Sequence, residues 1–228
     1  MRAENLPPLD LICFPTAGTL NKQQFRGRFF LYDEGGMTTY TLFGLIHRLT
    51  LGFSYGGDHL IGQKPVNWNQ KVDFTIKYRF LDETYNRPAI AAGYESQGIG
   101  SYSEDRYLFK STGFYCVVSK NFLLKGNLGV HGGINYSLED EDDHDVNFYV
   151  GLDKEIGSIV YLALEYSPGL NDDDPAARAY RRGFLNSSLG FHLPGGFDLE
   201  LVFLDLLENS KALSHPMRCI RIGLAAQL

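Results

Sequence analysis

The sequence predicts an all-β fold, a single antiparallel up-and-down β-barrel of about twelve strands. Three observations lead to this prediction. Apolar and polar residues alternate over many short stretches, these stretches are even in number and similar in length, and the connections between them are alternately short and long. A period of two residues places apolar side chains on one face of a strand and polar side chains on the other.

Composition sets the outer limits. The chain has 228 residues, of which 44% are apolar and 14% aromatic, so it is too apolar for a disordered chain. A net charge of -6 provides no general attraction for nucleic acid, and no nucleic-acid partner is expected. No apolar stretch approaches the roughly 18 residues that a spanning helix needs. A helical membrane protein is therefore excluded.

The strand at 70–81 shows the alternation most clearly. Its apolar face carries Val72, Phe74, Ile76, Tyr78 and Phe80, and its polar face carries Lys71, Asp73, Thr75, Lys77 and Arg79. The same reasoning gives twelve strands, at 23–32, 37–46, 48–57, 70–81, 88–96, 109–120, 126–136, 146–154, 158–167, 183–193, 197–206 and 217–228. Each is close to the 9 to 11 residues with which a tilted strand crosses a bilayer.

The connections separate the two ends of the barrel. Those after the even-numbered strands are short, such as His47-Arg48 and Pro194-Gly195-Gly196, whereas most of those after odd-numbered strands are long and polar, such as 58–69 and 97–108. Short turns at one end and long loops at the other are typical of barrels in the outer membrane of Gram-negative bacteria. The sequence predicts that location, with short periplasmic turns and long extracellular loops.

A soluble all-β ligand-binding protein is the alternative, because its strands alternate in the same way with the apolar face turned inward. Aromatic residues favour the membrane barrel, since those of the apolar face gather at strand ends. Tyr55 and Tyr136 lie at the long-loop end, and Phe25 and Phe197 lie at the short-turn end. Aromatic rings concentrate in this way at the two membrane interfaces.

In a membrane barrel the polar face lines the lumen. The predicted lumen-lining charged residues are Arg26, Arg28, Lys71, Asp73, Lys77, Arg79, Glu95, Asp153, Glu165, Asp198, Glu200 and Arg221. Six bases balance six acids, which suits either ion pairs bracing a narrow or blocked interior or a conducting path. Because the last strand closes the barrel, Arg221 is expected beside Asp198 and Glu200 or beside the arginines of the first strand. Glycines of the polar face are expected to make room for the Arg and Lys stems.

The N-terminal 22 residues stand outside the strand pattern. They are expected to form a lead-in segment before a barrel at 23–228, and a periplasmic segment, a lumen insert and an extra edge strand all remain open. Met1 to Leu11 has no apolar core region, so this chain is expected to carry no secretory signal peptide. The three cysteines are widely spaced and form no zinc-binding pattern.

Catalytic, metal and cofactor sites are not expected. Outer-membrane phospholipases of twelve strands use a Ser with a His two residues before it, and none of the six His here is so placed. The acidic run 139–145 lacks the glycine and the final glutamate of a calcium loop, and both this run and 171–174 are expected to be solvated loops. Gly98-Ile99-Gly100 lacks the third glycine of a nucleotide loop. The expected partners are outer-membrane lipid and lipopolysaccharide, with polysaccharide as a further candidate and the oligomeric state open.

Residues 11–17, Leu-Ile-Cys-Phe-Pro-Thr-Ala, resemble the opening L-I-x-x-P-T-A segment of YjbH-like outer-membrane proteins. Segments such as 55–57, 77–79 and 93–98 are similar to small barrels with the same opening, so the resemblance covers about residues 9–125. It implies a non-enzymatic, porin-like barrel, a narrow pore or an export-associated component linked to exopolysaccharide. A plugged structural or adhesion-type barrel that acts through its outer loops is the alternative.

Overall fold

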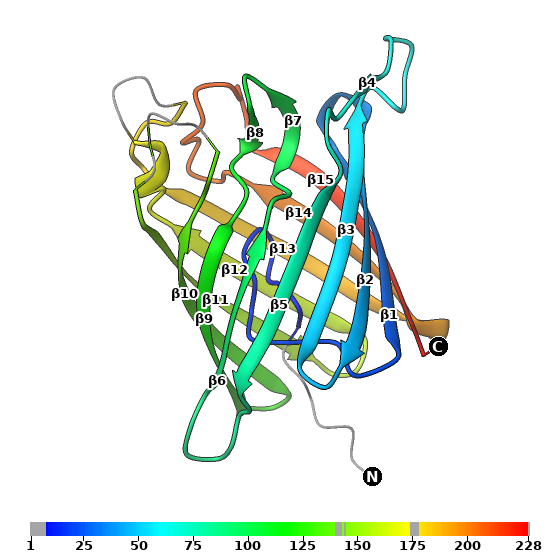
Figure 1. Ribbon diagram of the computed structural model, residues 1–228, viewed down its shortest axis with the longest axis vertical. Helices are drawn as coiled ribbons and strands as arrows, with labels where there is room; N and C mark the ends of the chain where they lie inside the picture. The colour runs from blue at the N-terminus through cyan, green and yellow to red at the C-terminus, as the bar shows by residue number, and fades with distance from the viewer. Residues whose placement is uncertain (1–7, 140–142, 144, 174–177, 228) are drawn as a thin grey trace.

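The computed structural model describes residues 8–139, 143, 145–173 and 178–227. Twelve of the described strands form a closed antiparallel barrel (Figure 1). These strands are β1 (Gln24–Tyr32), β2 (Gly36–Ile46), β3 (Leu49–Asp58), β5 (Asp73–Leu81), β6 (Ala89–Glu95), β9 (Gly113–Leu123), β10 (Asn127–Tyr136), β11 (Asn147–Ile156), β12 (Val160–Ser167), β13 (Phe184–Leu193), β14 (Phe197–Leu204) and β15 (Met217–Gln227). The prediction of a twelve-stranded up-and-down barrel is confirmed.

Pairing between β1 and β15 closes the barrel, with Phe25 opposite Ala226 and Leu31 opposite Ile220. Each strand pairs with the next barrel strand along the chain, and all pairs are antiparallel. Closure gives each of the twelve barrel strands two neighbours, so the described barrel wall has no open edge. Within the described residues, no helix is long and apolar enough to cross a membrane.

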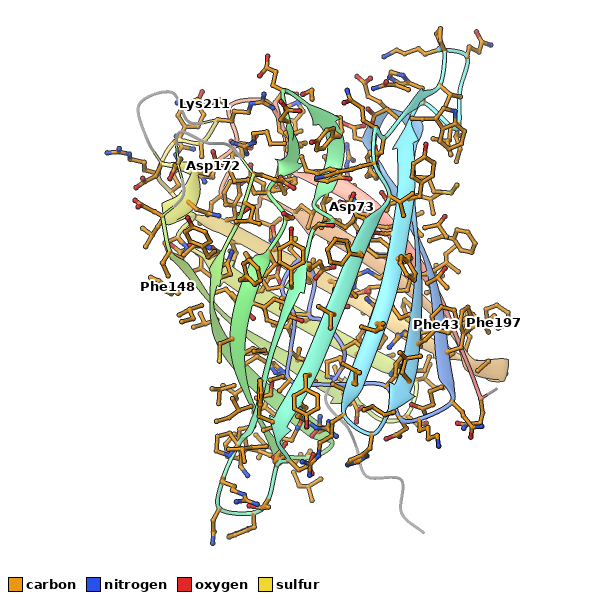
Figure 2. The ribbon with its side chains drawn as sticks, viewed as in Figure 1. Phe43, Asp73, Phe148, Asp172, Phe197 and Lys211 are labelled. Carbon is orange, nitrogen blue, oxygen red and sulfur yellow. The ribbon has the colours of Figure 1, made fainter. Side chains whose placement is uncertain are left out.

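The two faces of β5 show how the side chains are oriented. Phe74, Ile76 and Phe80 are 49%, 41% and 54% exposed on the outside, whereas Asp73 and Lys77 are 0% and 5% exposed inside. Other strands repeat the pattern, and Figure 2 shows Phe43, Phe148 and Phe197 pointing away from the barrel. The outer surface is therefore apolar and the inner surface polar. The opposite orientation, with a dry apolar centre, is wrong for this chain.

Interior glycines are matched with tyrosines on the neighbouring strand. Gly133 lies opposite Tyr149, and Gly190 lies opposite Tyr161. A Cβ on Gly133 would come within 2.5 Å of the Tyr149 ring, so only glycine leaves space for it. These glycines were expected to accommodate Arg and Lys stems. That expectation is wrong for Gly133 and Gly190, because the space is taken by aromatic rings.

The long-loop end carries further structure. The predicted loop 97–108 contains a hairpin formed by β7 (Ile99–Ser103) and β8 (Arg106–Phe109), and β4 (Asn67–Trp68) pairs with the end of β3. Two short 3-10 helices also lie at this end, Asp33–Gly35 (η1) and Leu170–Asp172 (η2), whereas a third, Pro194–Gly196 (η3), forms the short turn between β13 and β14 at the opposite end. Two strands at this end begin later than the sequence predicts. Phe109 belongs to β8 rather than to the following barrel strand, and the strand predicted at 70–81 begins at Asp73.

The described residues before β1 enter the barrel, as the dark blue segment in Figure 1 shows. We call residues 8–23 the plug. Its backbone folds back on itself, since Thr16 N donates to Leu9 O at 3.1 Å and Leu11 N donates to Phe14 O at 2.9 Å. Leu9 and Leu20 are both buried against Leu42 of β2, so the two ends of the plug lie together. Of the three possibilities left open for this segment, the structure shows the lumen insert.

Candidate functional site

The polar interior of the barrel holds the plug mainly through the plug's main chain. Barrel side chains from β3, β5, β9, β11, β12 and β15 each donate to or accept from a plug N–H or C=O group. An irregular segment has no neighbouring strand to satisfy its backbone, so buried N–H and C=O groups need such partners. The candidate site consists of the plug together with these side chains.

Glu165 of β12 is the main acceptor. Its carboxylate receives the backbone N–H groups of Ile12 at 3.0 Å, Cys13 at 2.8 Å and Phe14 at 3.3 Å. Asn186 of β13 donates to the same carboxylate at 2.9 Å. Glu165 is 1% exposed, and hydrogen bonds to a buried charge are stronger than those between neutral groups. Four donors thus compensate one buried carboxylate.

Arg221 of β15 holds the opposite side of the same turn. Its guanidinium donates to Leu11 O at 3.2 Å and to Ile12 O, and it lies 2.9 Å from Glu200 Oε2 on β14. The expectation that Arg221 lies beside the acid pair of the preceding strand is confirmed. Arg221 therefore links a barrel ion pair to the plug backbone.

Asp10 is the charged side chain that the plug brings into the lumen. Its Oδ2 is bound by Arg28 of β1, and its Oδ1 lies 3.4 Å from Lys77 Nζ of β5. Lys77 also donates to Leu9 O. Burial alone would raise the pKa of Asp10, but Arg28 and then Lys77 outweigh it and hold that pKa well below its usual range. Asp10 therefore remains a carboxylate.

Neutral side chains fix the rest of the plug. Tyr149 donates to Pro15 O at 3.0 Å, and its ring stacks on Phe14 with centroids 4.4 Å apart. Ala17 N donates to Ser119 Oγ at 2.9 Å. Leu20 N donates to Thr50 Oγ1 at 2.8 Å. The contacts run along the whole plug, so it is held as one unit.

Ser119 also belongs to a buried network within the barrel wall. His131 Nδ1 lies 2.8 Å from Ser119 Oγ, and His131 Nε2 lies 2.7 Å from Asp153 Oδ1. His131 and Ser119 are cross-strand partners on β10 and β9, which fixes their separation. This network supports the serine that receives Ala17 N.

The β7–β8 hairpin closes the lumen near the long loops, and we call residues 99–109 the cap. Tyr107 is fully buried, donates to Asp73 Oδ2, and accepts from Asn69 Nδ2 at 3.1 Å. Arg106 pairs with Asp172 through two bonds of 2.9 and 3.0 Å. Ile99 and Phe109 pack in one apolar cluster with Leu11 and Ile12 of the plug. The lumen is therefore obstructed at two levels.

Glu139 anchors the cap to the neighbouring long loop. Its Oε2 accepts the N–H groups of Tyr107 at 3.0 Å and Ser111 at 3.3 Å. Burial raises the pKa of Glu139, although these N–H groups partly offset the effect. Residues 140–142, 144 and 174 of the two acidic runs lie outside the described residues. The described part of the chain contains no group of three or more His, Cys, Asp or Glu side chains that could hold a metal ion.

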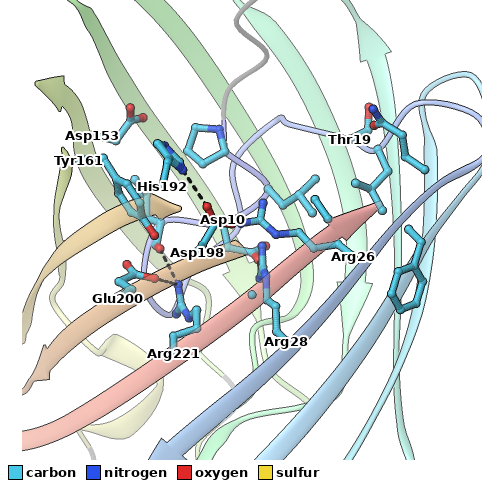
Figure 3. A pocket seen from close by; sticks show the side chains of 18 of the residues that line it. Asp10, Thr19, Arg26, Arg28, Asp153, Tyr161, His192, Asp198, Glu200 and Arg221 are labelled. Carbon is cyan, nitrogen blue, oxygen red and sulfur yellow. Dashed lines mark hydrogen bonds and ion pairs between the residues drawn. The ribbon is translucent and has the colours of Figure 1, made fainter. Parts of the chain in front are cut away.

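A cavity of about 490 Å³ lies at the short-turn end, between the plug and the wall formed by β1 and by β10 to β15 (Figure 3). Arg26 Nη2 lies 2.7 Å from Asp198 Oδ2, and His192 Nδ1 lies 2.7 Å from Asp198 Oδ1. The Tyr161 and His192 rings stack with centroids 4.7 Å apart. The cavity also reaches Asp10 and Arg28.

The structure places most of the predicted lumen-lining charges in the interior, in four groups. Two ion pairs line the cavity, Arg26 with Asp198 and Glu200 with Arg221. Arg28 and Lys77 hold Asp10. Glu165 holds the plug backbone, and Asp153 contacts His131. Arg79 lies 2.9 Å from Asp82 at the short-turn end, and Glu95 lines a small pocket with Asp10 and Arg28. Asp73 binds the cap.

Lys71 is the exception, because it precedes β5. Its side chain is 41% exposed, lies 3.6 Å from Asp73 and sits over the Tyr102 ring of the cap at 4.9 Å. The alternation continues through Lys71 and Val72 although strand pairing has ended. Lys71 is thus a rim residue that contacts the cap, rather than a residue of the barrel wall.

Sequence reasoning missed several residues that hold the plug: Asp10, Thr50, Ser119, His131 and Tyr149. The charge pattern of the polar face gives no signal for Thr50, Ser119, His131 and Tyr149. Their position on the polar face of predicted strands was a usable signal for Thr50, Ser119 and His131. Asp10 had none, because its role depends on where an irregular segment folds.

Comparison with known proteins supports the fold. No family model and no curated protein matches the sequence. The structure is similar to the NanC porin, with 12% sequence identity, a TM-score of 0.52, and coverage of 90% of this chain and 99% of that chain. It also matches an outer membrane channel from Pseudomonas putida F1, with 13% identity, a TM-score of 0.47, and coverage of 97% and 100%. Neither likeness supports the YjbH-like resemblance or a link to exopolysaccharide specifically.

Proposed function

We propose that the chain is a pore-type protein of the bacterial outer membrane and that the described conformation is its closed state. The apolar outer surface suits lipid contact, and the polar inner surface suits an aqueous path. The likeness of the fold to a porin supports the same assignment, as does the closed set of twelve strands. No enzymatic activity is part of the proposal.

The observation that carries the proposal is how the plug is held. Glu165, Arg221 and Lys77 bind backbone groups of the plug, and Lys77 also lies near the Asp10 carboxylate of the plug. Water or a solute can replace each of these plug groups. Ionised side chains are costly to bury unless they are paired and hydrogen-bonded, so a permanently filled interior gains little from them. A lumen that is alternately filled and hydrated accounts for such a lining.

A disulfide across the plug tests the proposal. Ala17 and Ser119 are in contact, so the A17C/S119C pair, in a background without Cys13, Cys116 and Cys219, would lock the plug when oxidised. We expect the oxidised protein to stay closed in planar bilayers, the reduced protein to show openings, and a variant lacking residues 8–20 to conduct more often. A truncated barrel that shows heat-modifiable migration in a detergent gel, and so is folded, yet never conducts would overturn the proposal.

A structural or adhesion-type barrel is the second candidate, and one observation favours it. The plug residues Leu11 and Ile12 share an apolar cluster with Ile99 and Phe109 of the cap. Such a cluster is typical of a permanent core. On this reading the truncated barrel stays silent in bilayers, and shortening the cap changes adhesion at the cell surface while the barrel remains folded.

The link to exopolysaccharide is the finer part of the proposal. It rests on the resemblance of residues 11–17 to the opening segment of YjbH-like outer-membrane proteins, and these residues belong to the part of the plug held by Glu165 and Tyr149. Cells that carry the chain without residues 8–20 are expected to differ from parental cells in surface polysaccharide. An unchanged amount, at equal barrel abundance in the membrane, would contradict this link.

A further inference from the structure

The Asp10 carboxylate occupies a prepared position in the lumen. One oxygen is bound by Arg28, and the other lies 3.4 Å from Lys77 Nζ. The two cationic side chains are 10% and 6% exposed, so they are nearly withdrawn from water. Buried cations need a counter-charge. In the closed state this counter-charge comes from the plug.

The other lumen cations have partners within the barrel itself. Arg26 pairs with Asp198, Arg221 with Glu200, and Arg79 with Asp82 in the adjoining turn. Among the described residues, Asp10 is the acid that Arg28 and Lys77 contact directly. Glu95 shares the small pocket beside Arg28. Without the plug, two cations would face this one barrel acid, which leaves a local excess of one positive charge.

The position is also reachable from one end. Asp10 and Arg28 both line the cavity of about 490 Å³ at the short-turn end, and Figure 3 shows Arg28 beside Asp10. The stacked rings of Tyr161 and His192 line the same cavity and offer an apolar face with polar edges. A solute that carries one carboxylate on a small polar ring fits this combination of charge and shape.

We infer that the Arg28–Lys77 pair is a carboxylate site of the lumen, occupied by Asp10 in the closed state and by carboxylate-bearing solutes when the plug leaves. The inference rests on the proposed function, because it names the class of solute for that channel. Asp10 acts as a tethered competitor. A free carboxylate that binds Arg28 and Lys77 therefore weakens the docking of the plug.

Competition can be measured on the full chain. In a C116A/C219A background, Cys13 is the single thiol and lies in the plug, so its labelling by a membrane-impermeant maleimide reports plug release. We expect sodium glucuronate to accelerate labelling several-fold and to saturate, whereas glucose at equal ionic strength does not. The R28K variant retains the response, and the R28Q/K77Q variant loses it. Equal labelling with glucuronate and glucose would overturn the inference.

Ion selectivity gives a second measurement. In a potassium chloride gradient, the barrel without residues 8–20 is expected to prefer chloride, and R28Q/K77Q in that barrel is expected to abolish the preference. Conduction without chloride preference would refute the carboxylate site and leave the proposed channel intact. A folded truncated barrel that does not conduct would refute the channel, and the labelling experiment would then decide the carboxylate site by itself.

Discussion

Replacing Glu165 with Gln is expected to loosen the plug while preserving the volume of the side chain. One carboxylate oxygen accepts from Ile12 and Phe14, and the other accepts from Cys13 and Asn186. A glutamine amide keeps one oxygen and presents an NH₂ group at the other position. At least one plug N–H therefore loses its acceptor and faces a donor.

The magnitude follows from the type of bond lost. A hydrogen bond to a charged group contributes about 1.5 to 3 kcal/mol, and an orphaned buried donor costs about 1 to 3 kcal/mol. Because the two terms overlap, we expect E165Q to destabilise the docked plug by about 2 to 4 kcal/mol. With about 1.4 kcal/mol per tenfold change, released plug becomes about 30 to 700 times more populated.

Maleimide labelling of Cys13, with Cys116 and Cys219 replaced by Ala, measures this population. If reclosing is faster than labelling, the labelling rate follows the opening equilibrium. Burial, and secondarily Glu165, raises the pKa of the docked Cys13 thiol, so a faster reaction inside the lumen has to be separated from release. Labelling of released plug has the same pH dependence in both proteins, whereas labelling in the lumen does not.

D198N is the matched control, since Asp198 contacts Arg26 and His192 rather than the plug. E165Q labelled at the wild-type rate would refute the conclusion that this carboxylate holds the plug. An equal increase in D198N would show that any loss of lumen charge loosens it.

Three further perturbations test other contacts. In G151A the new Cβ would overlap Leu11 Cδ1, and this overpacking should destabilise the docked plug by about 1 to 3 kcal/mol and raise the rate of Cys13 labelling about 5- to 150-fold. G132A is the control, because a Cβ at Gly132 meets no atom nearer than 3.7 Å and the labelling rate should stay unchanged. Y107F removes the hydroxyl that binds Asp73, so trypsin cleavage after Arg106 in the cap should accelerate about 10- to 150-fold, with Y102F as the unchanged control. The pKa of Glu139 is raised in the folded state, so between the ordinary pKa of about 4.3 and the raised pKa the folded state binds more protons than the unfolded state. The free energy of unfolding should therefore fall as pH rises through this interval. In E139Q the melting temperature should depend less on pH. Unchanged Cys13 labelling in G151A would contradict the close approach of Leu11 to Gly151. Cleavage as fast in Y102F as in Y107F would contradict the role of the Tyr107 hydroxyl. A steeper dependence of melting temperature on pH in E139Q would contradict the role of Glu139.

The barrel wall could be predicted because its signal repeats every two residues. The alternation at Phe74, Ile76 and Lys77 predicts which side chains lie on the outside of the barrel, and the even number of such stretches predicts closure. The plug could not be predicted in the same way, because its contacts use main-chain N–H and C=O groups, and these give no signal that depends on the side chain. The alternation does not predict the cap, because its strands have only five and four residues. Strand ends such as Lys71 were misplaced because side-chain alternation outlasts backbone pairing.

The adjacency of Leu9 and Leu20 beside Leu42 has a consequence for biogenesis. A segment whose two ends meet at one mouth can enter a finished cylinder as a folded loop, without threading a free terminus through the wall. Formation of the barrel wall and docking of the plug inside it are then separable events.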